Sequence, residues 1–157
     1  MEKHKFHFVV IFIIAILIIL IFIKLNYNNN QIGNISQVCI NENCFIVELA
    51  ITNEEKQIGV MNRPRLDKDK GMLFIYDNPT IASFWMKNTL IPLDIIWINK
   101  DFKIVYIANA NPCIKDPCTI YTPDEDANYI LEINSNLTKE LNIKEGDEVS
   151  INLKQNS

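Results

Sequence analysis

The chain has 157 residues, which is enough for one domain and an appended segment. Residues 25–157 contain 18 acidic and 12 basic side chains, so they offer no basic surface for nucleic acid. Both histidines, His4 and His7, precede residue 25. Their position excludes Ser–His–Asp and Cys–His catalysis, and imidazole metal sites, from the rest of the chain.

An apolar run at 6–23 predicts a transmembrane helix. Of its 18 residues, 17 are apolar, and a helix of that length spans roughly 27 Å. The run is longer than the core of a cleaved signal peptide, and no small-residue cleavage site follows it. Lys3 and Lys5 precede it, which places 1–5 in the cytoplasm. We therefore predict an uncleaved signal anchor in the cell membrane, an Asn-rich tether at 24–37 and an extracytoplasmic domain at 38–157.

The four cysteines form two pairs with the same spacing, Cys39 with Cys44 and Cys113 with Cys118. Outside the cytoplasm, an even number of closely spaced cysteines indicates disulfides. We favour a bond within each pair because each pair flanks a turn-forming stretch. A zinc site made of all four cysteines and a redox pair are the alternatives, although C-x4-C is a loose spacing for both. We expect no metal and no cofactor.

Short strands dominate the predicted domain. Apolar patterning predicts strands at 45–51, 72–76, 82–86, 93–98, 102–110, 129–133 and 149–153. Thr52 and Glu55 form a capping box that begins a helix reaching about residue 62, and Leu137 and Leu141 indicate a second short helix. Gly59 weakens the first helix, which suggests that something packs closely against it. Because the strands do not alternate regularly with helices, we predict a compact, strand-rich α+β fold. Its mostly antiparallel sheet curls toward a barrel, after the N-terminal transmembrane helix.

The stretch from Phe84 to Asp94 combines large apolar side chains with hydrogen-bonding ones. It predicts a pocket for a small polar or anionic ligand, with Trp85 stacking on the ligand and Lys87 binding its polar groups. The predicted ligand-binding residues are Arg63, Trp85, Met86, Lys87, Asn88, Thr89 and Asp94.

Two other interpretations of this stretch remain open. In the enzymatic one, Lys87 and Asp94 form an acid–base pair. In the structural one, Asp94 pairs with Lys87 or caps nearby backbone, while Trp85 and Met86 fill the core. Burial separates these interpretations, because a binding or catalytic pair has to line an open concave site.

Two weaker patterns also occur. The acidic triplet at 124–126 offers oxygen ligands for calcium, but its spacing matches no known calcium loop, and a solvated surface is the simpler interpretation. Asn34 and Asn136 begin glycosylation acceptor patterns, which matter only in a host that glycosylates surface proteins.

Several short segments together carry a family resemblance. They read Gly-Val-Met at 59–61, Gly-Met-Leu-Phe at 71–74, Phe-Trp-Met-Lys-Asn-Thr at 84–89, Ile-Pro-Leu-Asp at 91–94, Asn-Pro-Cys at 111–113, Leu-Glu at 131–132 and Gly-Asp at 146–147. In this order they resemble the family of domain of unknown function 192, also called uncharacterised protein family 0127. The resemblance covers about residues 38–153.

The resemblance implies a compact, strand-rich α+β domain, often behind a signal peptide or membrane anchor, and brings no established activity. We therefore expect a membrane-tethered, extracytoplasmic module of the cell envelope that binds a small ligand or serves as an accessory. A histidine-free enzyme using Lys87 and Asp94, and a purely structural envelope protein, are the alternatives.

Overall fold

The structure is a computed structural model that describes residues 13–24 and 35–154. The chain divides into two compact units, and the larger one is Ser36–Leu153. Within the smaller unit, residues 13–24 form a helix. The predicted tail at 1–5, most of the predicted tether and Asn34 lie outside the described residues.

The predicted transmembrane helix is wrong. Among the described residues, no helix is both long and apolar enough to cross a membrane. The helix at 13–24 has 12 residues, which give a length of about 18 Å against a bilayer core of about 30 Å. The first part of the apolar run, residues 6–12, lies outside the described residues.

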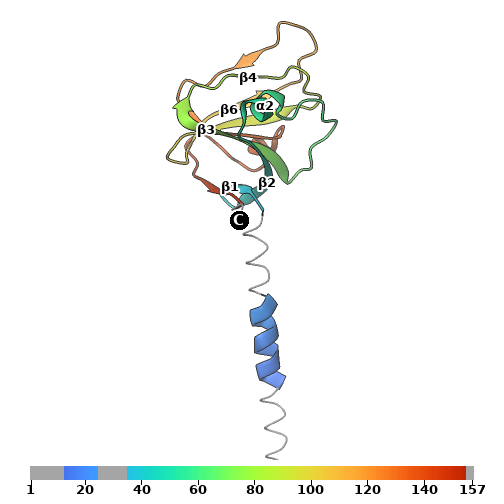
Figure 1. The fold of residues 1–157 in the computed structure, drawn as a ribbon, viewed down its shortest axis with the longest axis vertical. Coiled ribbons are helices and arrows are strands. Elements are labelled where there is room, and N and C mark those ends of the chain that lie inside the picture. The colour runs from blue at the N-terminus through green and yellow to red at the C-terminus, as the bar shows by residue number, and fades with distance from the viewer. Residues whose placement is uncertain (1–12, 25–34, 155–157) are drawn as a thin grey trace, which may run out of the picture. The chain divides into compact units, whose positions relative to one another are not determined.

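Seven strands of the larger unit form one sheet in the order β6-β5-β8-β3-β2-β1-β9. Their bounds are β1 Gln37–Ile40, β2 Asn43–Ala50, β3 Lys70–Thr80, β5 Leu93–Ile98, β6 Ile104–Ala110, β8 Ala127–Asn134 and β9 Val149–Asn152. Neighbouring strands are antiparallel except β2 and β3. A second, two-stranded sheet pairs β4 (Phe84–Trp85) with β7 (Ile120–Tyr121), at the end of the domain away from β1 (Figure 1).

The large sheet curls into a half-barrel. Strands β6 and β9 are the two edge strands of this sheet. An antiparallel bridge between Lys103 and Glu148 joins the chain just before β6 to the chain just before β9. Next to the bridge, the Val149 amide donates a hydrogen bond to the Phe102 carbonyl at 2.8 Å. The predicted strand-rich fold with a curled sheet and short helices is therefore confirmed.

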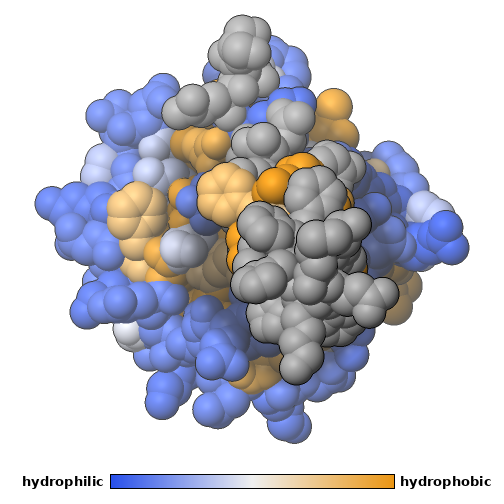
Figure 2. All heavy atoms as spheres, turned by 90° about the horizontal axis from the view of Figure 1, so that it is seen from below, coloured by the Kyte–Doolittle hydropathy of each residue, from blue (hydrophilic) through white to orange (hydrophobic). Residues whose placement is uncertain are grey.

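Both faces of the sheet are buried, as the apolar run at 93–98 predicts. All six residues of β5 are buried. One apolar cluster includes Leu73, Ile96 and Leu131, together with Leu137 of the short helix α3 (Leu137–Glu140). The cluster on the other face includes Phe74, Ile95, Trp97 and Ile130. Charged and polar residues form much of the outline of the domain seen from below (Figure 2).

Helix α2 (Asn53–Ile58) begins at the predicted capping box. The Glu55 amide donates to Thr52 Oγ1 at 3.2 Å, and the Thr52 amide donates to Glu55 Oε2 at 2.8 Å. The helix is shorter than predicted because Gly59 ends it with a φ of +50°. The close packing expected at Gly59 is present, since a Cβ there would lie 3.2 Å from Phe74 Cζ.

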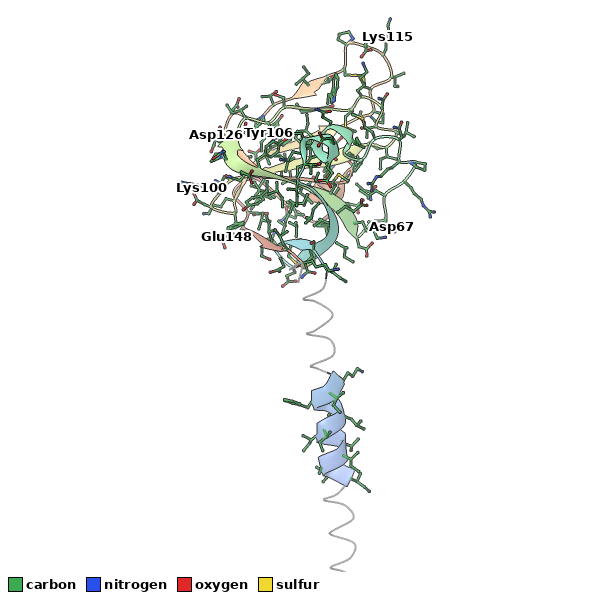
Figure 3. All side chains as sticks on the ribbon, in the orientation of Figure 1. Asp67, Lys100, Tyr106, Lys115, Asp126 and Glu148 are labelled. Carbon is green, nitrogen blue, oxygen red and sulfur yellow. A yellow bond between two sulfur atoms is a disulfide. The ribbon has the colours of Figure 1, made fainter. Side chains whose placement is uncertain are left out.

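The predicted disulfides are confirmed. Cys39 is bonded to Cys44, with a Cα–Cα distance of 4.0 Å, and Cys113 is bonded to Cys118, with a Cα–Cα distance of 5.4 Å. The first pair joins β1 to β2 at register partners next to the turn. The second closes the loop between β6 and β7, which carries Lys115 at the end of the domain (Figure 3).

Replacing Gly71 with alanine is expected to lower the free energy of unfolding by about 3 kcal/mol. Gly71 lies in β3, and a Cβ on it would stand 2.6 Å from the Glu132 carbonyl oxygen and 3.0 Å from Ile133 Cγ2. Because the first of these atoms belongs to the backbone of a central strand, one strand has to move.

Gly146→Ala is the matched control for this substitution. Its φ of +90° strains alanine, but nothing lies within 4 Å of the added Cβ, so we expect a loss of about 1 kcal/mol. Urea unfolding of both variants measures the difference. A Gly71→Ala variant as stable as the control would contradict the close packing of β3 on β8.

Candidate functional site

A cleft of about 450 Å³ opens on the sheet face that carries Phe74 and Trp97. Its walls come from α2 and the turn after it, from β3, and from residues 83–89 around β4. Four aromatic side chains line it: Phe74, Tyr76, Phe84 and Trp85. The cleft therefore joins segments that are distant in the sequence, and its walls combine aromatic, aliphatic and polar side chains.

Glu132 lines the same cleft from β8. It faces its register partners Met72 on β3 and Ile95 on β5, and strand alternation places it on the face opposite Leu131 and Ile133. The residue is only 5 % exposed, and its Oε2 atom has no hydrogen-bond partner among the described residues. A buried carboxyl group without a partner is rare in folded proteins.

Burial changes the charge of this group. Removal from water raises the pKa of Glu132 from 4.5 to about 8, although the positive charge of Arg63 acts in the opposite direction. Arg63 is occupied elsewhere, because its guanidinium donates to both carboxylate oxygens of Glu48, at 2.5 and 2.8 Å. That pairing lowers the pKa of Glu48. At pH 7 the Glu132 carboxyl group is therefore mostly neutral.

Ring packing fixes the aromatic wall. Phe84 makes edge contacts with Phe74, at 4.9 Å between ring centroids, and with Trp97, at 5.7 Å. The Trp97 indole N–H donates to the Ala82 carbonyl at 2.8 Å, which holds the segment before β4 against the sheet. The wall is therefore preorganised, whereas Trp85 is 49 % exposed.

Two lysine side chains lie over aromatic rings of the cleft. Lys56 Nζ stands 4.4 Å from the centroid of Tyr76, and Lys87 Nζ stands 5.4 Å from that of Trp85. Lys87 also pairs with Asp116 at 3.5 Å. The distances from the two ammonium groups to the ring centroids are typical of cation–π contacts, so the ring faces already attract ammonium groups.

Two of the predicted binding residues, Trp85 and Thr89, line the cleft. Met86 is instead a buried core residue, 2 % exposed. Asn88 has a φ of +58°, and its carbonyl accepts a hydrogen bond from the Asn62 amide at 2.9 Å. Arg63 and Lys87 are the paired side chains described above, and Asp94 is described in the next paragraph. The structure thus brings only part of the predicted set together.

Asp94 lies inside the fold and holds α3 in place. Its Oδ2 accepts from the Thr138 amide at 2.8 Å and from the Thr138 hydroxyl at 2.7 Å. Its Oδ1 accepts from Asn109 Nδ2 at 2.7 Å and from the Asn136 amide at 3.1 Å. Among the described residues, no ion pair joins Asp94 to Lys87. These four hydrogen bonds correspond to the structural interpretation of Asp94.

The acidic triplet lines a separate hollow of about 510 Å³ with Lys100 and Asp101. Figure 3 shows Asp126 and Lys100 on one side of the domain. In the part of the chain that the structure describes, the one group of three potential metal ligands is Cys113, Asp116 and Cys118. Its cysteines are disulfide-bonded, so they offer no thiolate.

Sequence reasoning missed Glu132, Tyr76 and Lys56 as cleft residues. Glu132 was visible as a lone acid within the apolar run at 129–133, although that pattern also fits a strand with one exposed face. Gly59 gave a second signal, because a Cβ there would lie 3.8 Å from Glu132 Oε2. The two signals are 73 positions apart in the sequence, and only the fold brings them together.

Residues 36–151 match the model of the DUF192 family, described as "Uncharacterized ACR". The chain belongs to this family. The match covers the cleft and the curled sheet up to Ile151 of β9, so both are features of the family domain in this chain. No curated protein matches the chain.

Two solved structures are similar to this family domain. One is a protein of unknown function from Novosphingobium aromaticivorans, with 38 % identity and a TM-score of 0.67, covering 74 % of this chain and 83 % of that one. The other, from Sinorhizobium meliloti, is described as a putative transcription regulator. It has 31 % identity and a TM-score of 0.67, covering 74 % of this chain and 91 % of that one.

Proposed function

We propose that this DUF192 domain is a small-ligand-binding module that works outside the cytoplasm. The observation that carries the proposal is the buried Glu132 Oε2 atom, which has no hydrogen-bond partner among the described residues and lies in an open cleft. Leaving a buried polar group unsatisfied costs about 1–3 kcal/mol. A ligand that provides the missing partner recovers that energy, which gives the buried acid a role in binding.

The dimensions and the walls of the cleft also fit a small ligand. Its volume of about 450 Å³ lies within the range of roughly 300–1,000 Å³ that is typical of small-molecule sites. Half-exposed Trp85 offers a face for stacking, while the packed Phe84 ring keeps the wall rigid. The two disulfides support a location outside the cytoplasm, where such bonds persist.

The geometry favours binding over the two alternatives. An acid–base pair of Lys87 and Asp94 lacks support because Asp94 uses both oxygens to hold α3. A purely structural role explains Asp94 but leaves Glu132 without a reason. Binding accounts for both residues, with Asp94 as part of the scaffold and Glu132 as part of the site.

Ligand binding is expected to depend on Trp85 and Glu132. A fragment library screened by amide NMR on the full-length, oxidised protein should give hits that shift the resonances of Gly59, Trp85 and Glu132. Trp85→Ala and Glu132→Gln should each lower the affinity for those fragments about tenfold, which is the effect of losing one stacking or buried polar contact.

Matched controls separate this result from a general loss of stability. Ile120→Ala changes the exposed register partner of Trp85, which does not line the cleft, and Glu125→Gln changes an exposed acid far from it. Both should leave the affinities unchanged. Hits that bind the Trp85→Ala and Glu132→Gln variants as well as the original chain would refute the cleft as the site.

A further inference from the structure

Among the described residues, no ion pair includes Glu132, although Lys56 lines the same cleft. Arg63 lies on the turn after α2, and its Nη1 and Nη2 atoms each donate one hydrogen bond to Glu48 of β2. On α2, Lys56 places its ammonium group over the Tyr76 ring. The register partners of Glu132 on β3 and β5 are the apolar side chains of Met72 and Ile95. Neither of these cations forms an ion pair with Glu132, so a ligand can supply the positive charge that pairs with it.

The rings around it attract the same kind of group. Tyr76 and Trp85 line the cleft, and each already lies under a lysine ammonium group of this chain, at 4.4 and 5.4 Å. Aromatic faces bind cations through their quadrupole, most strongly for alkylated ammonium groups that are poorly hydrated. Aromatic walls combined with one carboxyl group are the complement of an organic cation.

We propose that this cleft binds an organic cation, an alkylammonium group that packs on the Tyr76 and Trp85 rings and pairs with the Glu132 carboxylate. The inference rests on the proposed binding function and specifies its ligand class. The ammonium group takes the place that Lys56 occupies over Tyr76, so that the lysine side chain swings into solvent. Because Lys56 competes with the ligand for one ring and repels its charge, removing that lysine strengthens binding.

Binding of a cation is coupled to release of a proton. The carboxyl group is mostly protonated at pH 7, because burial raises the pKa of Glu132 to about 8. The groups that act on it electrostatically are Arg63, which favours ionisation, and the Tyr76 hydroxyl, which is neutral at this pH. When the ammonium group enters, the carboxyl group gives its proton to the buffer, and the resulting carboxylate pairs with the ligand. Most of one proton therefore leaves per ligand at pH 7, and much less at pH 9, where the free carboxyl group has already ionised.

Isothermal titration calorimetry of the full-length, oxidised protein tests this inference. The probes are tetramethylammonium, choline and benzyltrimethylammonium, which carry a permanent charge and do not titrate. The neutral isostere of choline, 3,3-dimethylbutan-1-ol, has nearly the same shape. We expect at least one ammonium probe to bind, and choline to bind at least tenfold more tightly than its isostere. Repeating the titrations in buffers of different ionisation enthalpy measures the released protons.

Three variants identify the groups involved. Glu132→Gln should abolish both the tenfold preference for charge and the proton release. Lys56→Gln should tighten binding severalfold, whereas an anionic ligand would bind that variant more weakly. Glu125→Gln, an exposed acid outside the cleft, is the control and should change neither quantity.

The outcomes distinguish a failure of this inference from a failure of the proposed binding function. If uncharged fragments bind at Trp85 and none of the ammonium probes does, or if the alcohol binds as tightly as choline, the ligand class is wrong and the binding function stands. Ammonium binding that Glu132→Gln leaves unchanged also overturns the inference. If neither the fragments nor the ammonium probes bind, the binding function itself fails.

Discussion

Replacing Asp94 with alanine is expected to lower the free energy of unfolding by about 4 kcal/mol. The side chain is fully buried and accepts four hydrogen bonds, two of them from backbone amides at the start of α3. Alanine leaves those amides, the Thr138 hydroxyl and the Asn109 amide group without their acceptor. The two bonds from Thr138 are buried, so each of these donors costs about 1 kcal/mol or more when its acceptor is removed. Asn109 keeps its hydrogen bond to Ser135 Oγ.

Urea unfolding at pH 7 measures this loss, and two further variants define its origin. Asp94→Asn keeps the shape but replaces one acceptor oxygen with a donor, so we expect roughly half the loss. Asp101→Ala removes an exposed acid and should change stability by less than about 0.5 kcal/mol. If Asp94→Ala costs less than about 1 kcal/mol, Asp94 does not hold α3 in place.

The effect of Asp94→Ala on ligand binding distinguishes a structural role of Asp94 from a role in the binding site. Asp94 and Thr138 do not line the cleft, so the folded fraction of the variant should bind ligands as the original chain does. An acid–base role of Asp94 with Lys87 predicts instead a loss of function that exceeds the loss of folded protein.

Local signals made much of the fold predictable. The capping box at Thr52, the paired cysteines and the apolar run at 93–98 each specify structure through neighbours in the sequence, and each was placed correctly. The short strands β1 and β7 were missed, whereas the equally short β4 and β9 were found because they lie within the apolar patterns at 82–86 and 149–153. The parallel pairing of β2 with β3 depends on tertiary packing, which no local pattern encodes.

The site was less predictable because its parts meet only in the fold. The sequence assigned Trp85 and Lys87 to one pocket, and the structure does bring them within a cation–π contact. The same argument gave no distance between Lys87 and Asp94, which serve different networks. A lone acid such as Glu132 is ambiguous in a sequence, because the same pattern fits an exposed strand face and a buried site.

The stability of the domain is expected to fall as the pH rises from about 5 to about 8 because of Glu132. Burial raises the pKa of Glu132 from 4.5 to about 8, so in this range the folded state keeps a proton that the unfolded state has lost. Stability falls with pH wherever the folded state binds more protons. The full shift corresponds to a loss of up to about 5 kcal/mol, which is complete above pH 8.

Glu132→Gln removes this titration while keeping the shape of the side chain. Urea unfolding of both proteins between pH 5 and pH 9 should show the variant gaining stability relative to the original chain as the pH rises, by several kcal/mol in total. Comparing the two proteins cancels the carboxylates whose pKa is lowered, such as Glu48 and Asp67, because both chains share them. Glu125→Gln, an exposed acid, should follow the original chain.

A difference between the two proteins that does not change with pH would show that Glu132 is ionised in the folded state, with water or a neighbour in place of the missing partner. The expected result links stability to function. The free energy that ionised Glu132 costs the fold above pH 8 is the free energy that a cation in the cleft recovers by pairing with it. An organic cation should therefore stabilise the original chain more at pH 8 than at pH 5, and the Glu132→Gln variant equally at both.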